Sequence, residues 1–193
     1  LALLWRLARR LEAERGRPSN AGKFRDYNFT IAWGDGAQAV DAARVEIAPR
    51  ARGAPLDLIV SELMIFANRT WGKLLADRGA AAIYRVKTGT GPAGKVRMTS
   101  APAAHIGLGV SHYAWSSSPL RRYVDLVNQW QLIAQLRGEA PPFGPKSAEL
   151  LAALRDFELT YAAYAEFQRG MERYWCLRWL LQQDAKAATG QVL

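Results

Sequence analysis

The chain of 193 residues is half hydrophobic and strongly basic, with a formal net charge of +9. This length and apolar content fit one domain with a core of its own, and the excess of Lys and Arg favours a polyanionic partner, above all nucleic acid. The lone cysteine, Cys176, excludes an internal disulfide, argues against a structural zinc site and suits a reducing cytoplasm. No apolar run reaches the roughly 20 residues that cross a bilayer, so we expect no membrane partner.

Helical spacing and turn residues divide the chain into helices and short strands. Gly16 and Gly79 mark the ends of two helices, and Gly34-Asp35-Gly36 predicts a hairpin turn. The expected elements are a helix over 1–15, hairpin strands over 27–33 and 37–40, a further strand over 45–48, a helix over 55–77, a strand over 81–86, a helix over 120–136, and a helix from 147 to about 187 with a bend near Gly170. This order predicts a mixed α and β domain whose C-terminal part is rich in helices.

Both ends of the sequence fall within an expected element. Leu1 already lies inside the first helical pattern, and ATGQVL at 188–193 stops where a strand begins. We therefore expect the chain to be a piece of a longer protein.

Residues for metal-dependent or nucleophilic catalysis are not grouped in the sequence. Two-metal phosphoryl chemistry needs several carboxylates converging on ions about 4 Å apart, and no close cluster of aspartates is found. The serines at 116–118 lack the GxSxG elbow of a nucleophile. The Gly-rich stretch 88–94 is not followed by GK[ST], so we interpret it as a connector. Catalysis by this chain alone is therefore not supported.

The stretch 113–126, YAWSSSPLRRYVDL, has the composition of an anion grip. Ser118 and the proline after it predict a helix start, whose free N–H groups and partial positive charge favour anions. Arg121 adds a planar fork that matches a phosphate, and Asp125 four residues later is expected on the same helix face. Arg122 lies about 100° further around the helix and adds only a charge. The alternative is an ordinary capped helix with solvated arginines.

Aromatic and ionisable residues near this stretch have both a binding and a structural interpretation. Tyr113 or Trp115 is able to stack a base, but core packing is the commoner use of such residues. His105 is more often a structural histidine, and Glu172 a solvated helix carboxylate paired with a neighbouring Arg. The remaining tryptophans at apolar helical positions are expected in the core: Trp5, Trp71, Trp130, Trp175 and Trp179.

Several linked motifs together resemble the RNB family, the ribonuclease II-like exoribonucleases. In order and spacing they are VSELMIFAN at 60–68, IYR at 83–85, HIGLG at 105–109 and SSPLRRYVDL at 117–126. The resemblance covers essentially the whole chain and implies an α+β fold, with short mixed strands packed by helices. Residues 1–187 would form the helix-rich C-terminal part of an RNB-type catalytic domain, and residues 188–193 the start of a following domain, an oligonucleotide-binding barrel.

The resemblance also implies an activity. The family hydrolyses single-stranded RNA from its 3′ end to nucleoside 5′-monophosphates with Mg²⁺, which is bound by aspartates that precede the part seen here. This chain would then grip RNA phosphate, need the upstream remainder of the RNB domain, and be inactive alone.

Individual roles follow from the same resemblance. Arg121 matches the family arginine that contacts RNA phosphate near the scissile bond, which is a catalytic role. The residues that match RNA-binding positions are His105, Tyr113, Ser117, Ser118, Arg121, Glu172 and Glu62. Ser61 stands where many relatives carry a second acid, and Arg85 is closer to His105 than in the best-known bacterial enzymes. The alternatives are a non-catalytic RNA-binding relative without the aspartates, and a basic scaffold with no RNA role.

Overall fold

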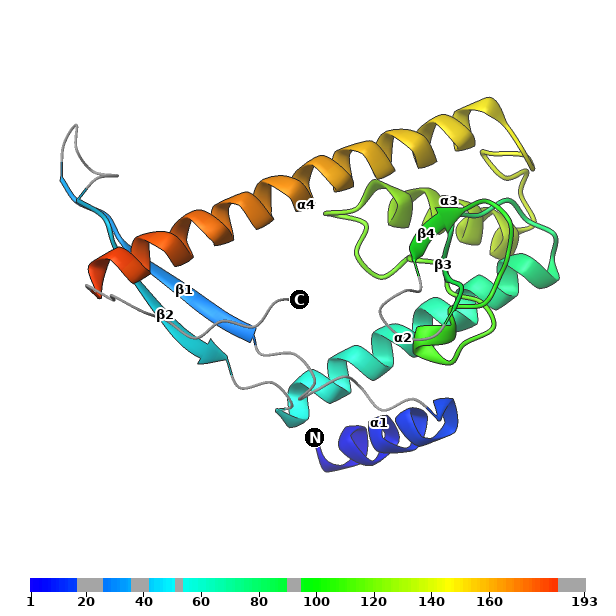
Figure 1. The fold of residues 1–193 in the computed structure, drawn as a ribbon. Coiled ribbons are helices and arrows are strands. Elements are labelled where there is room, and N and C mark those ends of the chain that lie inside the picture. Colours follow the sequence, from blue (N-terminus) through cyan, green and yellow to red (C-terminus); the bar gives the residue numbers. More distant parts are fainter. Residues whose placement is uncertain (17–25, 36–41, 51–53, 90–94, 184–193) are drawn as a thin grey trace. The chain divides into compact units, whose positions relative to one another are not determined.

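A computed structural model describes residues 1–16, 26–35, 42–50, 54–89 and 95–183 (Figure 1). The chain divides into two compact units, residues 1–21 with 53–161 and residues 22–52 with 162–193. Helices dominate, and the described strands form two separate two-stranded antiparallel sheets. The predicted helix-rich α+β class is confirmed.

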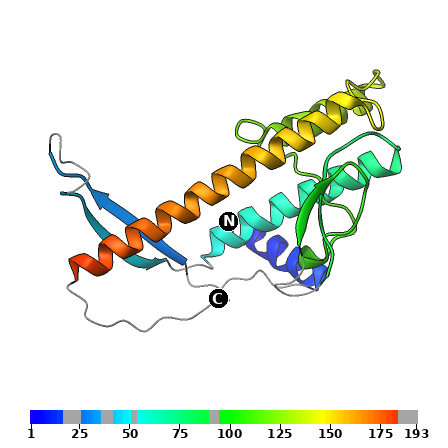
Figure 2. The same cartoon turned by 45° about the horizontal axis from the view of Figure 1, so that its top comes forward.

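In the first unit, α1 (Ala2–Arg15) lies along α2 (Pro55–Asp77), as Figure 2 shows from a second direction. Ala8 of α1 packs against Leu58 and Ile59 of α2. Pro55 suits the first position of α2 because it has no N–H to leave without a partner. Glycines with positive φ, Gly16 after α1 and Gly79 after α2, reverse the chain where other residues would be strained.

The main core of this unit joins a short sheet to two further helices. β3 (Tyr84–Lys87) pairs with β4 (Val96–Thr99), and η2 (Ile106–Leu108), a single 3₁₀ turn, follows. Next come α3 (Tyr123–Arg137) and α4 (Ala148–Gln182), of which the part up to Tyr161 belongs to this unit. The buried side chains that hold these pieces together are Ile83, Val110, Tyr113, Trp115, Val124, Val127 and Leu150.

One glycine sets how closely α2 approaches the segment before α3. A Cβ atom at Gly72 would lie 2.9 Å from the backbone nitrogen of Ala114 and 3.2 Å from its Cβ. No side chain fits at the first distance without moving the backbone. The segment 113–118 therefore runs directly against the helix.

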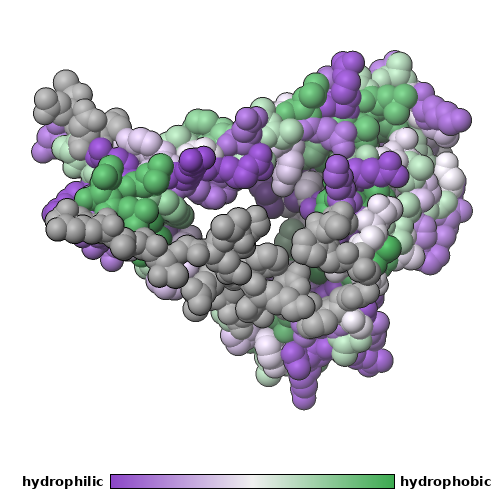
Figure 3. Space-filling view, in the orientation of Figure 1, coloured by the Kyte–Doolittle hydropathy of each residue, from purple (hydrophilic) through white to green (hydrophobic). Residues whose placement is uncertain are grey.

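The second unit is a hairpin packed on the last part of α4. β1 (Asp26–Ala32) pairs with β2 (Arg44–Arg50), from Asp26 opposite Arg50 to Ala32 opposite Arg44. Ala43 and Val45 are buried against Trp175, whose ring meets Trp33 edge to face at 5.6 Å. In Figure 3 this unit shows a concentration of hydrophobic surface over the hairpin and the end of α4.

Several boundaries differ from the predicted ones. The described partner of β1 is 44–50 instead of 37–40, and residues 37–40 lie outside the described residues. The strand predicted over 81–86 is shorter and shifted to 84–87, β4 was not predicted, and α3 begins at Tyr123 instead of at 120. α4 continues through Gly170 as one helix. Residues 188–193, the predicted start of another domain, also lie outside the described residues.

The described helices include none with the length and apolar character that membrane crossing requires.

Candidate functional site

Side-chain amides from two helices hold the segment that leads to the arginines. Asn68 of α2, fully buried, accepts the N–H of Ser116 at 2.9 Å and donates to Oγ of Ser117 at 3.2 Å. Asn128 of α3 accepts the N–H of Ile83 at 2.8 Å and donates to the carbonyls of Ile83 and Trp115. These side-chain amides supply hydrogen bonds that a neighbouring strand would otherwise give to the backbone. The buried amides are tolerated in the core because they are hydrogen-bonded.

A tight turn precedes α3, and a buried carboxylate closes it. The N–H groups of Arg121 and Arg122 lie 3.2 and 3.1 Å from the carbonyl of Ser118. Asp125, fully buried, accepts the N–H of Ser118 at 2.9 Å. The predicted helix start at Ser118 and Pro119 is wrong, since these residues form a separate turn and α3 begins at Tyr123 after the N-cap residue Arg122.

The two arginines of the turn differ in their surroundings. Arg122 forms a bidentate pair with Asp125, with both N–O distances at 2.7 Å, and its guanidinium lies 4.0 Å from the centre of the Trp115 ring. Arg121 is exposed and makes one long contact, 3.4 Å, with Oγ of Ser118. The predicted pairing of Arg121 with Asp125 is wrong, because Arg121 precedes the helix and the helical spacing does not apply to it.

Trp115 and Tyr113 are core residues in this structure, with 8% and 7% of their surface exposed. Trp115 meets Phe157 and Tyr161 of α4 edge to face, and it also contacts Arg85 of β3, whose guanidinium lies 4.8 Å from the ring centre. Core packing therefore accounts for both rings, and neither offers a free face for a base. Of the tryptophans expected in the core, Trp130 is an exception, with 38% of its surface exposed.

His105 is buried beside positive charge and stays neutral. Burial, then Arg85, and Lys87 more weakly, lower the pKa of His105 from 6.5 to about 4. Nε2 lies 3.2 Å from Nη1 of Arg85. A guanidinium can only donate, so Nε2 must present its lone pair. Nδ1 of the neutral ring then carries the proton and does not accept the Leu108 N–H, which lies 3.2 Å away. That N–H has another acceptor, the carbonyl of His105 at 3.0 Å.

Glu62 is occupied by an ion pair inside the first unit. It is 1% exposed and forms a two-pronged pair with Arg15 at the end of α1. The same guanidinium donates to the carbonyl of Leu108 at 2.6 Å, so the pair joins α1, α2 and the turn at η2. In this structure Glu62 positions the turn after His105 and has no carboxylate oxygen turned to solvent.

Glu172 lies on the part of α4 that belongs to the second unit. It is exposed and accepts a hydrogen bond from Gln168 at 2.8 Å, one helical turn earlier. An amide of the same helix, instead of the neighbouring Arg, is thus its partner.

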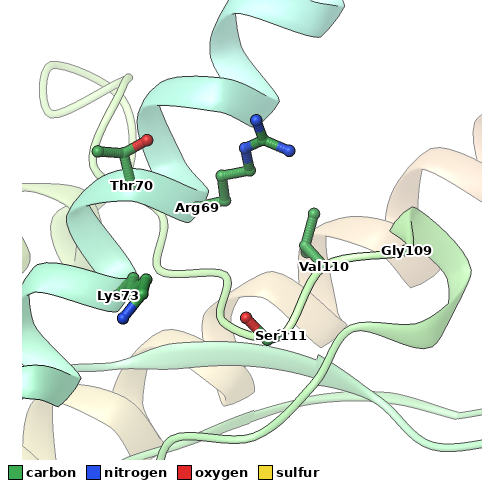
Figure 4. Close-up of a pocket in the computed structure, with 6 residues that line it drawn as sticks. All are labelled: Arg69, Thr70, Lys73, Gly109, Val110 and Ser111. Atoms are coloured by element: carbon green, nitrogen blue, oxygen red, sulfur yellow. The ribbon is translucent and has the colours of Figure 1, made fainter. Parts of the chain in front are cut away.

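A basic hollow of about 310 Å³ lies between α2 and the residues after η2 (Figure 4). Arg69 and Lys73 line it from successive turns of α2, with Ser111 opposite. Both cations have carboxylates nearby, because Lys73 pairs with Asp77 at 2.6 Å and Arg69 lies 3.8 Å from Glu14. The positive charge of the hollow is therefore largely balanced by these two carboxylates.

Sequence reasoning missed four residues that hold the site. These are Arg85, Asn68, Asn128 and Gln131. The side-chain amide of Gln131 donates hydrogen bonds to the carbonyls of Ala81 and Phe143. A signal existed for the amides, since polar residues within apolar helical stretches are usually hydrogen-bonded when buried. Their partners could not be read from the sequence, because they lie in other segments.

Comparison with known proteins connects this geometry to a family. A model of the RNB domain matches residues 92–138, the stretch that contains His105, Arg121 and Asp125. An uncharacterised ribonuclease of Synechocystis is 28% identical over 158 residues, which is 70% of this chain and 23% of that protein. Exoribonuclease 2 of Glaesserella parasuis is 55% identical over 40 residues, 21% of this chain and 6% of that protein. The chain thus spans less than a quarter of the length of these relatives.

Solved structures share the fold across almost the whole chain. The Dss1 exoribonuclease of Candida glabrata superposes with a TM-score of 0.75 at 19% identity, covering 98% of this chain and 28% of that one. RNase R of Mycoplasma genitalium, solved with double-stranded RNA, gives a TM-score of 0.66 at 16% identity, covering 95% and 41%. The chain therefore shares the fold of the matching parts of these two proteins. The predicted resemblance to the RNB family is confirmed, since a model of its domain matches residues 92–138 and the similar proteins above are ribonucleases.

Proposed function

We propose that this chain is part of a 3′→5′ exoribonuclease that hydrolyses single-stranded RNA to nucleoside 5′-monophosphates, and that it grips the RNA phosphate. One observation carries the proposal. The segment matched by the RNB domain contains a turn, fastened by Asp125, that leaves Arg121 exposed with most of its donors unused. The net charge of +9 agrees with a polyanionic substrate.

The proposed division of labour follows from the contacts of the turn. The fork of Arg121 would hold two oxygens of the phosphate near the scissile bond, where charge develops during hydrolysis. Ser117 and Ser118 would add hydroxyl contacts. Asn68 and Asp125 would act by positioning, since they fix the backbone of these serines.

Mg²⁺ is the metal that the family implies, and the described residues do not fit it. They contain no group of three or more His, Cys, Asp and Glu side chains arranged to hold a metal ion. We therefore derive no step through the metal. In this proposal Mg²⁺ is bound by the remainder of the RNB domain, and that remainder and an oligonucleotide-binding barrel are the partners of this chain in the complete protein.

The test uses the complete protein and single-stranded RNA labelled at its 5′ end. We expect a ladder that shortens from the 3′ end with Mg²⁺ present, with nucleoside 5′-monophosphates as products, and a strong loss of rate in Arg121→Ala. RNA binding without Mg²⁺-dependent hydrolysis would instead establish the non-catalytic relative. Absence of both binding and hydrolysis would support the basic scaffold.

A further inference from the structure

Arg85 is a half-buried cation that lies outside the turn with the two arginines. Its guanidinium contacts Nε2 of His105 at 3.2 Å and the ring of Trp115 at 4.8 Å. Among the described residues no carboxylate lies within ion-pair distance of it, whereas Arg122, beside the same ring, is paired with Asp125. Arg85 is thus a half-buried cation without a carboxylate partner among the described residues.

The surroundings of Arg85 give it little of the stabilisation that a half-buried charge needs. Removing a cation from water is unfavourable unless a counter-charge replaces the water. Here burial lowers the pKa of Arg85, the nearby Tyr113 and Tyr161 act in the opposite direction, and the positive charge of Arg122 adds to the lowering. A ring face and one imidazole lone pair offset this cost in part. An anion would offset it more fully.

The guanidinium of Arg85 is also held in position by its neighbours before any ligand binds. The N–H of Arg85 donates to the carbonyl of Tyr113 at 2.8 Å, which fixes the strand, and His105 orients the guanidinium. A guanidinium has five N–H donors, and the contact with His105 uses one of them. A fork held in place by its neighbours loses little entropy when it binds an oxyanion.

We propose that Arg85 is a second phosphate-binding residue, that its ligand is an oxyanion of the phosphate class, and that His105 positions it. The source of the phosphate rests on the proposed function, under which it is a phosphodiester of single-stranded RNA at a position other than the one held by Arg121. The structural alternative is a cation that only ties β3 to the turn at His105.

The experiment compares the complete protein with Arg85→Gln, Arg85→Lys and the control Arg97→Gln. Arg97 is exposed on β4, so its substitution removes the same charge from the neighbouring strand. One arm measures the anisotropy of a labelled single-stranded RNA over a series of salt concentrations, with EDTA present to prevent hydrolysis. The other arm measures the midpoint of thermal unfolding with sodium phosphate, with sodium chloride at equal ionic strength as the reference.

We expect Arg85→Gln to weaken RNA binding about tenfold and to reduce the log–log salt slope by about 0.7, the value of one single-strand phosphate contact. Arg85→Lys should keep the slope and lose part of the affinity, and Arg97→Gln should change affinity less than about threefold, as expected for an exposed charge. Phosphate should raise the unfolding midpoint of the parent but not of Arg85→Gln.

The outcomes separate this inference from the proposed function. If the parent binds RNA and both Arg85 variants bind it equally well, the inference is wrong and the proposed function stands. If the parent does not bind RNA but inorganic phosphate protects it through Arg85, the anion site stands and the proposed function is wrong. If Arg85→Gln does not fold, Arg85→Lys decides, and parental affinity for RNA in that variant overturns the inference.

Discussion

Arg121 and Arg122 are neighbours in the sequence with opposite surroundings. Arg121 is exposed, whereas the guanidinium of Arg122 lies between a buried carboxylate and an indole ring. A lysine at 122 would keep the charge but lose the two parallel hydrogen bonds to Asp125 and the contact with Trp115. The fork is therefore structural at one position and available to a ligand at the other.

This contrast predicts that Arg121→Lys lowers the rate of hydrolysis, whereas Arg122→Lys lowers the stability of the fold. In the complete enzyme, Arg121→Lys should slow single-turnover hydrolysis about tenfold, roughly 1.4 kcal/mol at the barrier. Its free energy of unfolding should change by less than about 0.5 kcal/mol. Arg122→Lys should lower the free energy of unfolding by about 1–3 kcal/mol, because the buried carboxylate of Asp125 loses its partner. A loss of rate confined to Arg122→Lys would contradict the assignment.

The neutral state of His105 makes stability depend on pH in a defined window. Its pKa is about 4 in the folded chain against an ordinary 6.5, so between these values the unfolded chain binds a proton that the folded chain does not. The free energy of unfolding should therefore fall as the pH drops through this window, by roughly 3 kcal/mol for the full shift. Arg85 and Lys87 are the charged groups that face the ring.

Denaturant unfolding of the parent and of His105→Gln between pH 4 and pH 7 measures this contribution. The difference in stability between the two proteins should shrink as the medium becomes more acidic. A difference that does not change with pH would show that the imidazole is exposed to protons in the folded state.

At the scale of elements, the close approach of α2 to Ala114 can be tested by substituting one glycine. Gly72→Ala should destabilise the protein by about 1–3 kcal/mol, because its new methyl group would meet the backbone of Ala114 at 2.9 Å. Gly170→Ala is the matched control, since a methyl group added at this glycine of α4 would have nothing within 4 Å. That change should be neutral or stabilise by up to about 1 kcal/mol. Thermal unfolding of both variants tests the opposite signs.

The same elements show what the sequence could predict. The ends of α1 and α2 were predicted well because glycine chemistry after a helix is local. The start of α3 was not, because the residues after Ser118 form a separate turn that Asp125 of the helix holds through the N–H of Ser118. β4 was missed because its partner lies across a glycine-rich connector, and strand pairing depends on such distant neighbours.

The motifs identified several residues of the site, but the contacts of these residues were harder to predict. Arg121 and the serines were found through the motif, and the structure leaves Arg121 exposed as that role requires. Glu62 was also found, but its buried pairing with Arg15 depends on a helix 47 residues earlier, which no local pattern reveals. Arg85 lies within a motif but had no predicted role, because its lack of a carboxylate among the described residues is visible only in three dimensions.

At the scale of the whole chain, charge and family together predict binding without catalysis. The purified 193-residue chain has a net charge of +9, and its described residues form no metal-ion cluster. We expect it to bind single-stranded RNA weakly, with a log–log salt slope of about −0.7 for each phosphate contacted. We also expect no release of mononucleotides with Mg²⁺. Hydrolysis by this chain free of contaminating nuclease, or affinity indifferent to salt, would contradict the proposal.

The amides that hold the arginine-bearing segment also bear on the order in which the chain folds. The bond from Asn68 to Ser116 spans 48 positions and that from Asn128 to Ile83 spans 45, so each closes a long loop before it contributes any stability. These are single polar contacts of high sequence separation, and we expect them to form after the rate-limiting step, that is, with low φ-values. We expect Asn68→Ala to speed unfolding and to leave the refolding rate nearly unchanged, as stopped-flow chevrons would show. The segment with the exposed arginine would then be among the last to take its native shape, and a nascent chain would acquire its hold on phosphate only once the helices around that segment are in place.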